Sequence, residues 1–94
     1  LKKIKQIREE FYSDLTKIRE KYKRFYIHPS EANFILLRFQ TREISRSVYQ
    51  FLLKNQIKVR KLDAGLSNCL RISIGTSLQM KNVIKILNLY FEVI

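Results

Sequence analysis

The chain has 94 residues, a formal net charge of +11, 46% hydrophobic residues, one cysteine and one histidine. This length allows one domain with a modest core, and the hydrophobic content argues against a disordered chain. There is no apolar run of about 18 residues to span a membrane, no second cysteine for an internal disulfide and no zinc-ligand spacing. The chain starts without an apolar signal core, so the expected location is the cytoplasm.

The basic charge has two explanations. A net charge of +11 is typical of proteins that bind nucleic acid. However, twelve isoleucines and eleven lysines dominate the composition, and both have AT-rich codons, so genome bias explains the charge without a polyanionic partner. The lysines are also spread along the chain and form no block, so we favour the compositional explanation.

Residues 1–25 are predicted to form a long amphipathic helix, because apolar residues recur at spacings of three and four. Residues 26–30 end it, since Pro29 lacks a backbone donor and biases His28 towards extended geometry. His28 has no acidic or cysteine neighbour and is interpreted as a loop residue. The apolar stripe consists of Leu1, Ile4, Ile7, Phe11, Leu15, Ile18, Tyr22 and Phe25.

A strand and a second helix follow. The short apolar run at residues 33–39 is bounded by loop residues and predicts a strand. Thr41 is a suitable N-cap for a helix over residues 42–54, and Asn55 is expected to end it in the left-handed conformation. The apolar face of this helix carries Ile44, Val48, Phe51 and Leu52.

The last third of the chain predicts two strands and a helix. Residues 57–60 alternate as a short strand, and residues 61–68 form a turn that contains Gly65. Residues 69–74 alternate more cleanly, with Leu70, Ile72 and Ile74 on one face and Cys69, Arg71 and Ser73 on the other. Thr76 and Gln79 have the spacing of a capping box for a helix over residues 77–92. Its apolar residues are Leu78, Val83, Leu87, Tyr90, Phe91 and Ile94.

The order of elements predicts an α+β fold. One small antiparallel or mixed sheet, formed by residues 33–39, 57–60 and 69–74, is expected to carry helices on one face, with the long N-terminal helix preceding it. Leu70, Ile72 and Ile74 should then face the helices at 42–54 and 77–92.

Arg71 is the first candidate for a functional residue. Cys69 and Ser73 flank it on the same face of the strand, and such small neighbours leave a hollow around the guanidinium. A guanidinium in a hollow offers a planar fork of donors to a carboxylate or a phosphate. The alternative is an exposed arginine on a solvated face, and the pattern alone leaves both open.

Four motifs occur in a fixed order: PSEANFIL at residues 29–36, Val48-Tyr49 with Leu52 and Leu53, IKVR at 57–60, and GLSNCLRISIGT at 65–76. Together they resemble the C-terminal small domain of histidinol-phosphate aminotransferase. The order and spacing match from about residue 8 to residue 94. The last motif is the most specific. Related aminotransferases of the same fold type share its arginine, but the residues around that arginine match less closely.

The resemblance implies a pyridoxal-phosphate enzyme of histidine biosynthesis. In that family an amino group moves between histidinol phosphate and 2-oxoglutarate, with glutamate as the other amino donor, and the substrate lies between a large and a small domain. The resemblance assigns the substrate carboxylate to Arg71 and the phosphate of histidinol phosphate to Arg60. If strands 57–60 and 69–74 are adjacent, both cations line one wall of the cleft. Cys69 is then a small cleft or core residue and no nucleophile.

The chain departs from the family by lacking the large domain. No lysine stands in a Ser/Thr-x-x-Lys context, so the resemblance implies that pyridoxal phosphate is held by the missing large domain and that residues 1–94 are an inactive fragment, without catalytic, cofactor-binding or metal-binding residues of its own. Residues 1–25 would bridge to the large domain. Its absence predicts self-association through residues 1–25 or through the face that would meet the large domain, and the family implies a homodimer.

The sequence alone is compatible with two other functions. Nucleic-acid-binding modules share the order of elements and the charge, but their sheets present aromatic residues for base stacking. Strands 57–60 and 69–74 have none, and Phe34 and Phe39 have opposite parity on strand 33–39. The second alternative is a small-molecule regulatory domain. We expect neither nucleic acid nor membrane as a partner.

Overall fold

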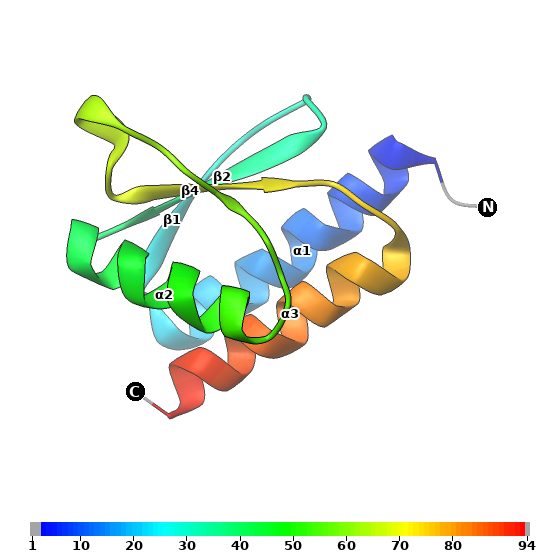
Figure 1. Ribbon diagram of the computed structural model, residues 1–94. Coiled ribbons are helices and arrows are strands. Elements are labelled where there is room, and N and C mark those ends of the chain that lie inside the picture. Colours follow the sequence, from blue (N-terminus) through cyan, green and yellow to red (C-terminus); the bar gives the residue numbers. More distant parts are fainter. Residues whose placement is uncertain (1–2, 94) are drawn as a thin grey trace.

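The computed structural model describes residues 3–93 and shows one four-stranded antiparallel sheet with helices on one side (Figure 1). The strand order across the sheet is β1, β2, β4, β3, so the last strand of the chain lies in the interior of the sheet. The predicted α+β class with helices on one face is thereby confirmed. The strands are β1 (Phe25–His28), β2 (Phe34–Phe39), β3 (Arg60–Lys61) and β4 (Cys69–Ser73).

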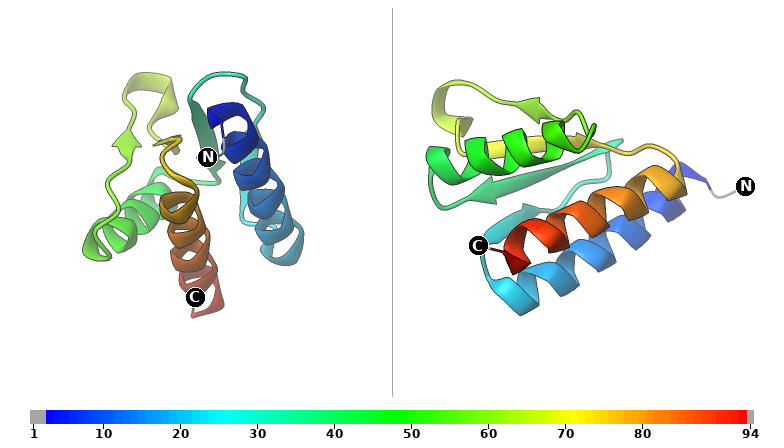
Figure 2. Two further views of the ribbon diagram at one scale, coloured as in Figure 1. Left: turned by 90° about the vertical axis from the view of Figure 1, so that its right-hand side faces the viewer. Right: turned by 60° about the horizontal axis from the view of Figure 1, so that its bottom comes forward.

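Three helices form one layer against the sheet. Seen end-on in the left panel of Figure 2, they lie in the order α1, α3, α2. No helix in residues 3–93 is both long and apolar enough to cross a membrane. The helices are α1 (Ile4–Tyr22), α2 (Arg42–Lys54) and α3 (Ser77–Glu92), and a short 3-10 turn, η1 (Ala64–Leu66), precedes β4.

The core lies between the sheet and the helix layer. Leu70 and Ile72 of β4 are buried there, Ile72 with 1% of its surface exposed, and their cross-strand partners Leu37 and Ile35 are buried beside them. The predicted inward face of this strand is therefore confirmed for these two residues. Ile74 follows the end of β4 and is only half-buried.

Both predicted N-terminal caps form. Helix α2 begins and ends at the predicted residues, and the Thr41 hydroxyl accepts a hydrogen bond from the Ile44 N–H at 3.1 Å. At the start of α3 both bonds of the capping box form, since Thr76 N–H donates to Gln79 Oε1 at 2.8 Å and Gln79 N–H donates to Thr76 Oγ1 at 3.1 Å. These side chains satisfy helix donors that would otherwise lack partners.

The first helix ends earlier than predicted. Lys23 takes the left-handed conformation (φ 55°, ψ 44°), and its N–H donates to the Arg19 carbonyl at 2.7 Å, which closes α1 at Tyr22. The predicted stripe also included Leu1, which, like Ile94 at the other end, lies outside the described residues. Phe25 lies three residues after Tyr22 and so matched the helical spacing of the apolar stripe, although it belongs to strand β1.

Residues 25–28 form strand β1, which the sequence did not predict. The assignment of His28 to a loop was wrong, because His28 is the last residue of β1 and pairs with Leu36. Phe25 and Ile27 point into the core opposite Phe39 and Leu37. With only two inward residues, the strand was too short to show its period against the helical spacing before it.

Three smaller predictions were also wrong. Asn55 does not adopt the left-handed conformation (φ −96°), whereas Gln56 does (φ 65°). The side-chain amide of Asn55 donates to the Phe51 carbonyl at 2.8 Å. Strand β3 contains two residues where residues 57–60 were predicted, because only Arg60 and Lys61 pair with β4. Leu78 is 79% exposed in the first turn of α3 and does not contribute to its buried face.

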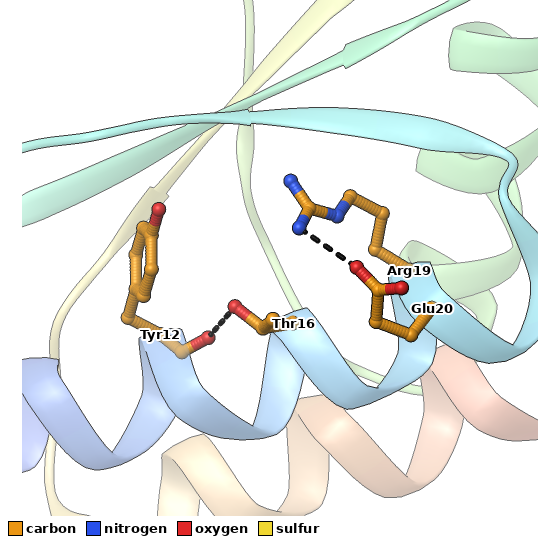
Figure 3. A network of polar contacts seen from close by, with 4 residues as sticks. All are labelled: Tyr12, Thr16, Arg19 and Glu20. Atoms are coloured by element: carbon orange, nitrogen blue, oxygen red, sulfur yellow. Dashed lines mark hydrogen bonds and ion pairs between the residues drawn. The ribbon is translucent and has the colours of Figure 1, made fainter.

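Helix α1 is an integral part of this domain. Its stripe of Ile7, Phe11, Leu15 and Ile18 is buried, whereas Ile4 is 48% exposed. On its polar side, Thr16 Oγ1 donates to the Tyr12 carbonyl at 2.9 Å and Arg19 pairs with Glu20 at 3.0 Å (Figure 3). The apolar stripe of α1 is thus covered by the domain's own core.

We expect Ile72→Ala to reduce the free energy of unfolding by about 2–5 kcal/mol, because it leaves a cavity between the sheet and the helices. Ser73→Ala, at the exposed end of β4, should change it by no more than about 0.5 kcal/mol. Urea denaturation of the chain followed by circular dichroism measures both. Equal effects for the two variants would show that the register of β4 is wrong.

Candidate functional site

One row of side chains crosses the face of the sheet that the helices leave open. His28, Leu36, Arg71 and Arg60 are successive cross-strand partners on β1, β2, β4 and β3. Directly paired residues of an antiparallel sheet point to the same side. Since the neighbouring pair of Ile35 and Ile72 points into the core, this row points away from the helices.

The structure brings the two predicted site residues together. Strands β3 and β4 are adjacent, with Arg60 directly opposite Arg71. This was the condition under which both cations would line one wall of a cleft, and it is met. The Arg71 side chain is half-buried, whereas Arg60 is exposed.

A shallow hollow of about 450 Å³ surrounds the two arginines. Its lining includes four cationic residues and no carboxylate. Like charges directly opposite one another destabilise a strand pair, so an anion bound in this hollow would relieve the repulsion. The lining residues are Tyr49, Lys58, Val59, Arg60, Lys61, Arg71 and Ser73.

The hollow expected around Arg71 is only partly empty. Its guanidinium carbon lies 4.8 Å from the centre of the Phe34 ring, and its Nε atom is buried without a hydrogen-bond partner in residues 3–93. Cys69 is fully buried, as expected for a small core or cleft residue. The arrangement leaves a cation over an aromatic ring, with the Nε donor unused within residues 3–93.

The sequence did not reveal Phe34, Lys58 or Lys61 as neighbours of the site. Alternation along β2 places Phe34 and Leu36 on one face, but only the register with β4, in which Phe34 pairs with Ser73, shows that this ring is diagonal to Arg71. The Lys61 Nζ atom lies 4.7 Å from the centre of the Tyr49 ring on α2, and the two elements are distant in sequence. No local signal indicates either contact.

Metal-ligand clusters and buried lysines are both absent from the described residues. No group of three or more potential metal ligands occurs in residues 3–93. Every lysine in that range is exposed, whereas an imine-forming lysine is activated by a desolvating pocket or a neighbouring cation. The cations that line the hollow, in contrast, are of the kind that bind anions.

Comparison with solved structures identifies the fold. The fold is that of a domain found in pyridoxal-phosphate aminotransferases, including a histidinol-phosphate aminotransferase from Sinorhizobium meliloti in complex with pyridoxal phosphate (TM-score 0.73, 20% identity, 93% of this chain and 24% of that one). A decarboxylase from Sulfurospirillum multivorans shares it (TM-score 0.64, 22% identity, 89% of this chain and 26% of that one). These similarities show the fold alone, and that fold serves more than one reaction.

Comparison with curated sequences is more specific. A histidinol-phosphate aminotransferase of Buchnera aphidicola is 42% identical over 66 residues, 68% of this chain and 18% of the relative. That of Pyrococcus furiosus is 36% identical over 81 residues, 83% of this chain and 22% of the relative. The chain is therefore related to the histidinol-phosphate aminotransferases, as its motifs indicated, and spans about a fifth of the length of the relatives it matches. No family model matches the chain.

Inorganic phosphate should bind weakly to the isolated chain at the basic hollow. Titration followed by NMR should shift the backbone amide signals of β3 and β4, and Arg60→Gln should weaken binding several-fold by removing one of the paired cations. Lys85→Gln, at an exposed position of α3 outside the hollow, is the control for net charge. Equal weakening by both variants would show that only the overall charge attracts the anion.

Proposed function

We propose that the chain is the C-terminal, substrate-binding small domain of a histidinol-phosphate aminotransferase, which transfers an amino group between histidinol phosphate and 2-oxoglutarate. The observation that carries this proposal is the pairing of Arg60 with Arg71 on the open face of a domain related to that family. The relatives do not favour the alternatives of a nucleic-acid-binding module or a regulatory domain.

Arg71 is suited to the carboxylate of glutamate or 2-oxoglutarate. Arg71 is half-buried with its guanidinium over the Phe34 ring, and two parallel N–H groups of a guanidinium can meet both oxygens of a carboxylate. Partial burial strengthens this interaction relative to one in water. Histidinol phosphate has an alcohol in place of the carboxylate, and the same donors can contact that neutral end.

Arg60 is suited to the phosphate group of histidinol phosphate. It is exposed at the edge of the sheet and shares the hollow with Lys58 and Lys61. Several cations around one hollow match a dianion better than a single carboxylate. The two ends of the substrate are thus assigned to different cations.

In this proposal the described residues do not form the cofactor site, and the exposure of every lysine among them supports it. In this proposal pyridoxal phosphate is bound by the large domain that the relatives' greater length accommodates, and it supplies the electron sink for amino transfer. The residues of this chain hold and orient the substrate and do not carry out the chemical step.

We further propose a homodimeric enzyme in the cytoplasm. Helix α1 buries its own apolar stripe, so of the two predicted surfaces the face that would meet the large domain is the more suitable for self-association of the isolated chain. Residues 1–25 remain the segment proposed to bridge to the large domain.

Arg71→Lys in the complete enzyme should lower the affinity for glutamate or 2-oxoglutarate about 10- to 100-fold, because a point charge cannot match a carboxylate as a planar fork does. Histidinol phosphate should be affected less. Arg60→Ala should show the opposite bias. The ratio of kcat/KM for the two amino donors in each variant measures this, and equal losses for both donors in both variants would mean that the arginines only support the fold.

The isolated chain should show no absorbance of bound pyridoxal phosphate and no transamination. Joined to its native upstream sequence, it should show the absorbance of a lysine-bound cofactor, since the lysine is supplied there. Spectra of both proteins with added cofactor provide the test. Stoichiometric cofactor on one defined lysine of residues 1–94 would overturn the assignment.

A further inference from the structure

Among the described residues, the Arg71 side chain contacts an aromatic ring and pairs with no carboxylate. Its guanidinium carbon lies 4.8 Å from the centre of the Phe34 ring. Its Nε atom is buried and has no hydrogen-bond partner in the described residues 3–93. A buried cationic donor without a partner costs free energy. Some other contact must therefore favour this position of the Arg71 side chain.

The sheet register fixes the position of the ring. Phe34 pairs with Ser73 and Leu36 pairs with Arg71, which puts Phe34 diagonally across from the arginine on the open face. Diagonal neighbours on antiparallel strands are within reach when one is aromatic and the other is long. Phe34 is itself half-buried at the start of β2, so its ring is a fixed surface.

A cation–π contact with Phe34 affects the Arg71 guanidinium differently from an ion pair. A carboxylate beside Arg71 would occupy the donor edge of the guanidinium and neutralise its charge. An aromatic ring contacts only one flat side of the group and leaves the charge and the edge donors available. It also restricts the rotation of a long side chain, which reduces the conformational entropy lost when a ligand binds.

We propose that Phe34 is a positioning residue that orients the Arg71 guanidinium for bidentate contact with the substrate carboxylate. This inference rests on the proposed function, because it assigns Phe34 a role through Arg71. Phe34 acts on the ligand only through the arginine, so its contribution should vanish when the arginine is removed.

The test uses the complete enzyme that contains this chain. Phe34→Leu keeps an apolar side chain but removes the ring, and it should raise KM for glutamate about three- to tenfold while kcat changes less than about twofold. Phe34→Tyr keeps the ring and should restore KM to within about twofold. Tyr26→Leu is the matched control, since Tyr26 is an exposed aromatic residue on the same face that packs on His28 and not on Arg71.

A double-mutant cycle separates positioning from folding. In an Arg71→Ala background, Phe34→Leu should lower kcat/KM for glutamate by no more than about twofold, because the group that it orients is gone. The same additional loss in both backgrounds would overturn the proposal, since Phe34 would then act on the fold. An effect of Arg71→Ala without any effect of Phe34→Leu would also overturn it and leave the proposed function intact. If Arg71→Ala itself changes nothing, the proposed function fails and this inference fails with it.

Discussion

The pairing of β2 with β4 determines both the core and the candidate site. In one register it places Ile35 against Ile72 and Leu37 against Leu70 on the helix side, where all four are buried. The alternate residues of the same two strands place Arg71 beside Leu36 and diagonal to Phe34 on the open side. Because side chains alternate with a period of two, a slip of one residue would bury the arginine and expose the core. Packing on one face therefore specifies the position of the cation on the other.

The open face combines features that a stable isolated domain would avoid. Within residues 3–93, Arg60 and Arg71 lie opposite each other without a carboxylate in the hollow that they share, and Arg71 has a buried donor without a partner. Buried, unsatisfied polar groups and paired like charges occur at functional sites, where a ligand completes them. The hydrophobic core behind the sheet stabilises this arrangement without a ligand. The division of the sheet into a packed face and a charged face is the main observation behind the proposal that the charged face binds anions.

Elements with strong local signals could be predicted from the sequence. Thr41 and the capping box of Thr76 and Gln79 fixed the starts of α2 and α3, because capping is an interaction between residues three apart. Strand β1 was missed because its inward residues, Phe25 and Ile27, follow a helix whose spacing already included Phe25. Arg71 and Arg60 were found by motif and resemblance. Phe34 was not, because its contact depends on the register of two strands that are distant in sequence.

The central claim is that Arg71 and Arg60 bind opposite ends of the substrates. A crystal structure of the complete enzyme with 2-oxoglutarate, and one with histidinol phosphate, tests it most directly. In the complex with 2-oxoglutarate, the account predicts a carboxylate oxygen at about 2.7–2.9 Å from the Arg71 donors, with the guanidinium still over the Phe34 ring. In the complex with histidinol phosphate, it predicts the phosphate at Arg60. A ligand bound away from the open face of the sheet, or Arg71 paired with a protein carboxylate in both complexes, would contradict the account.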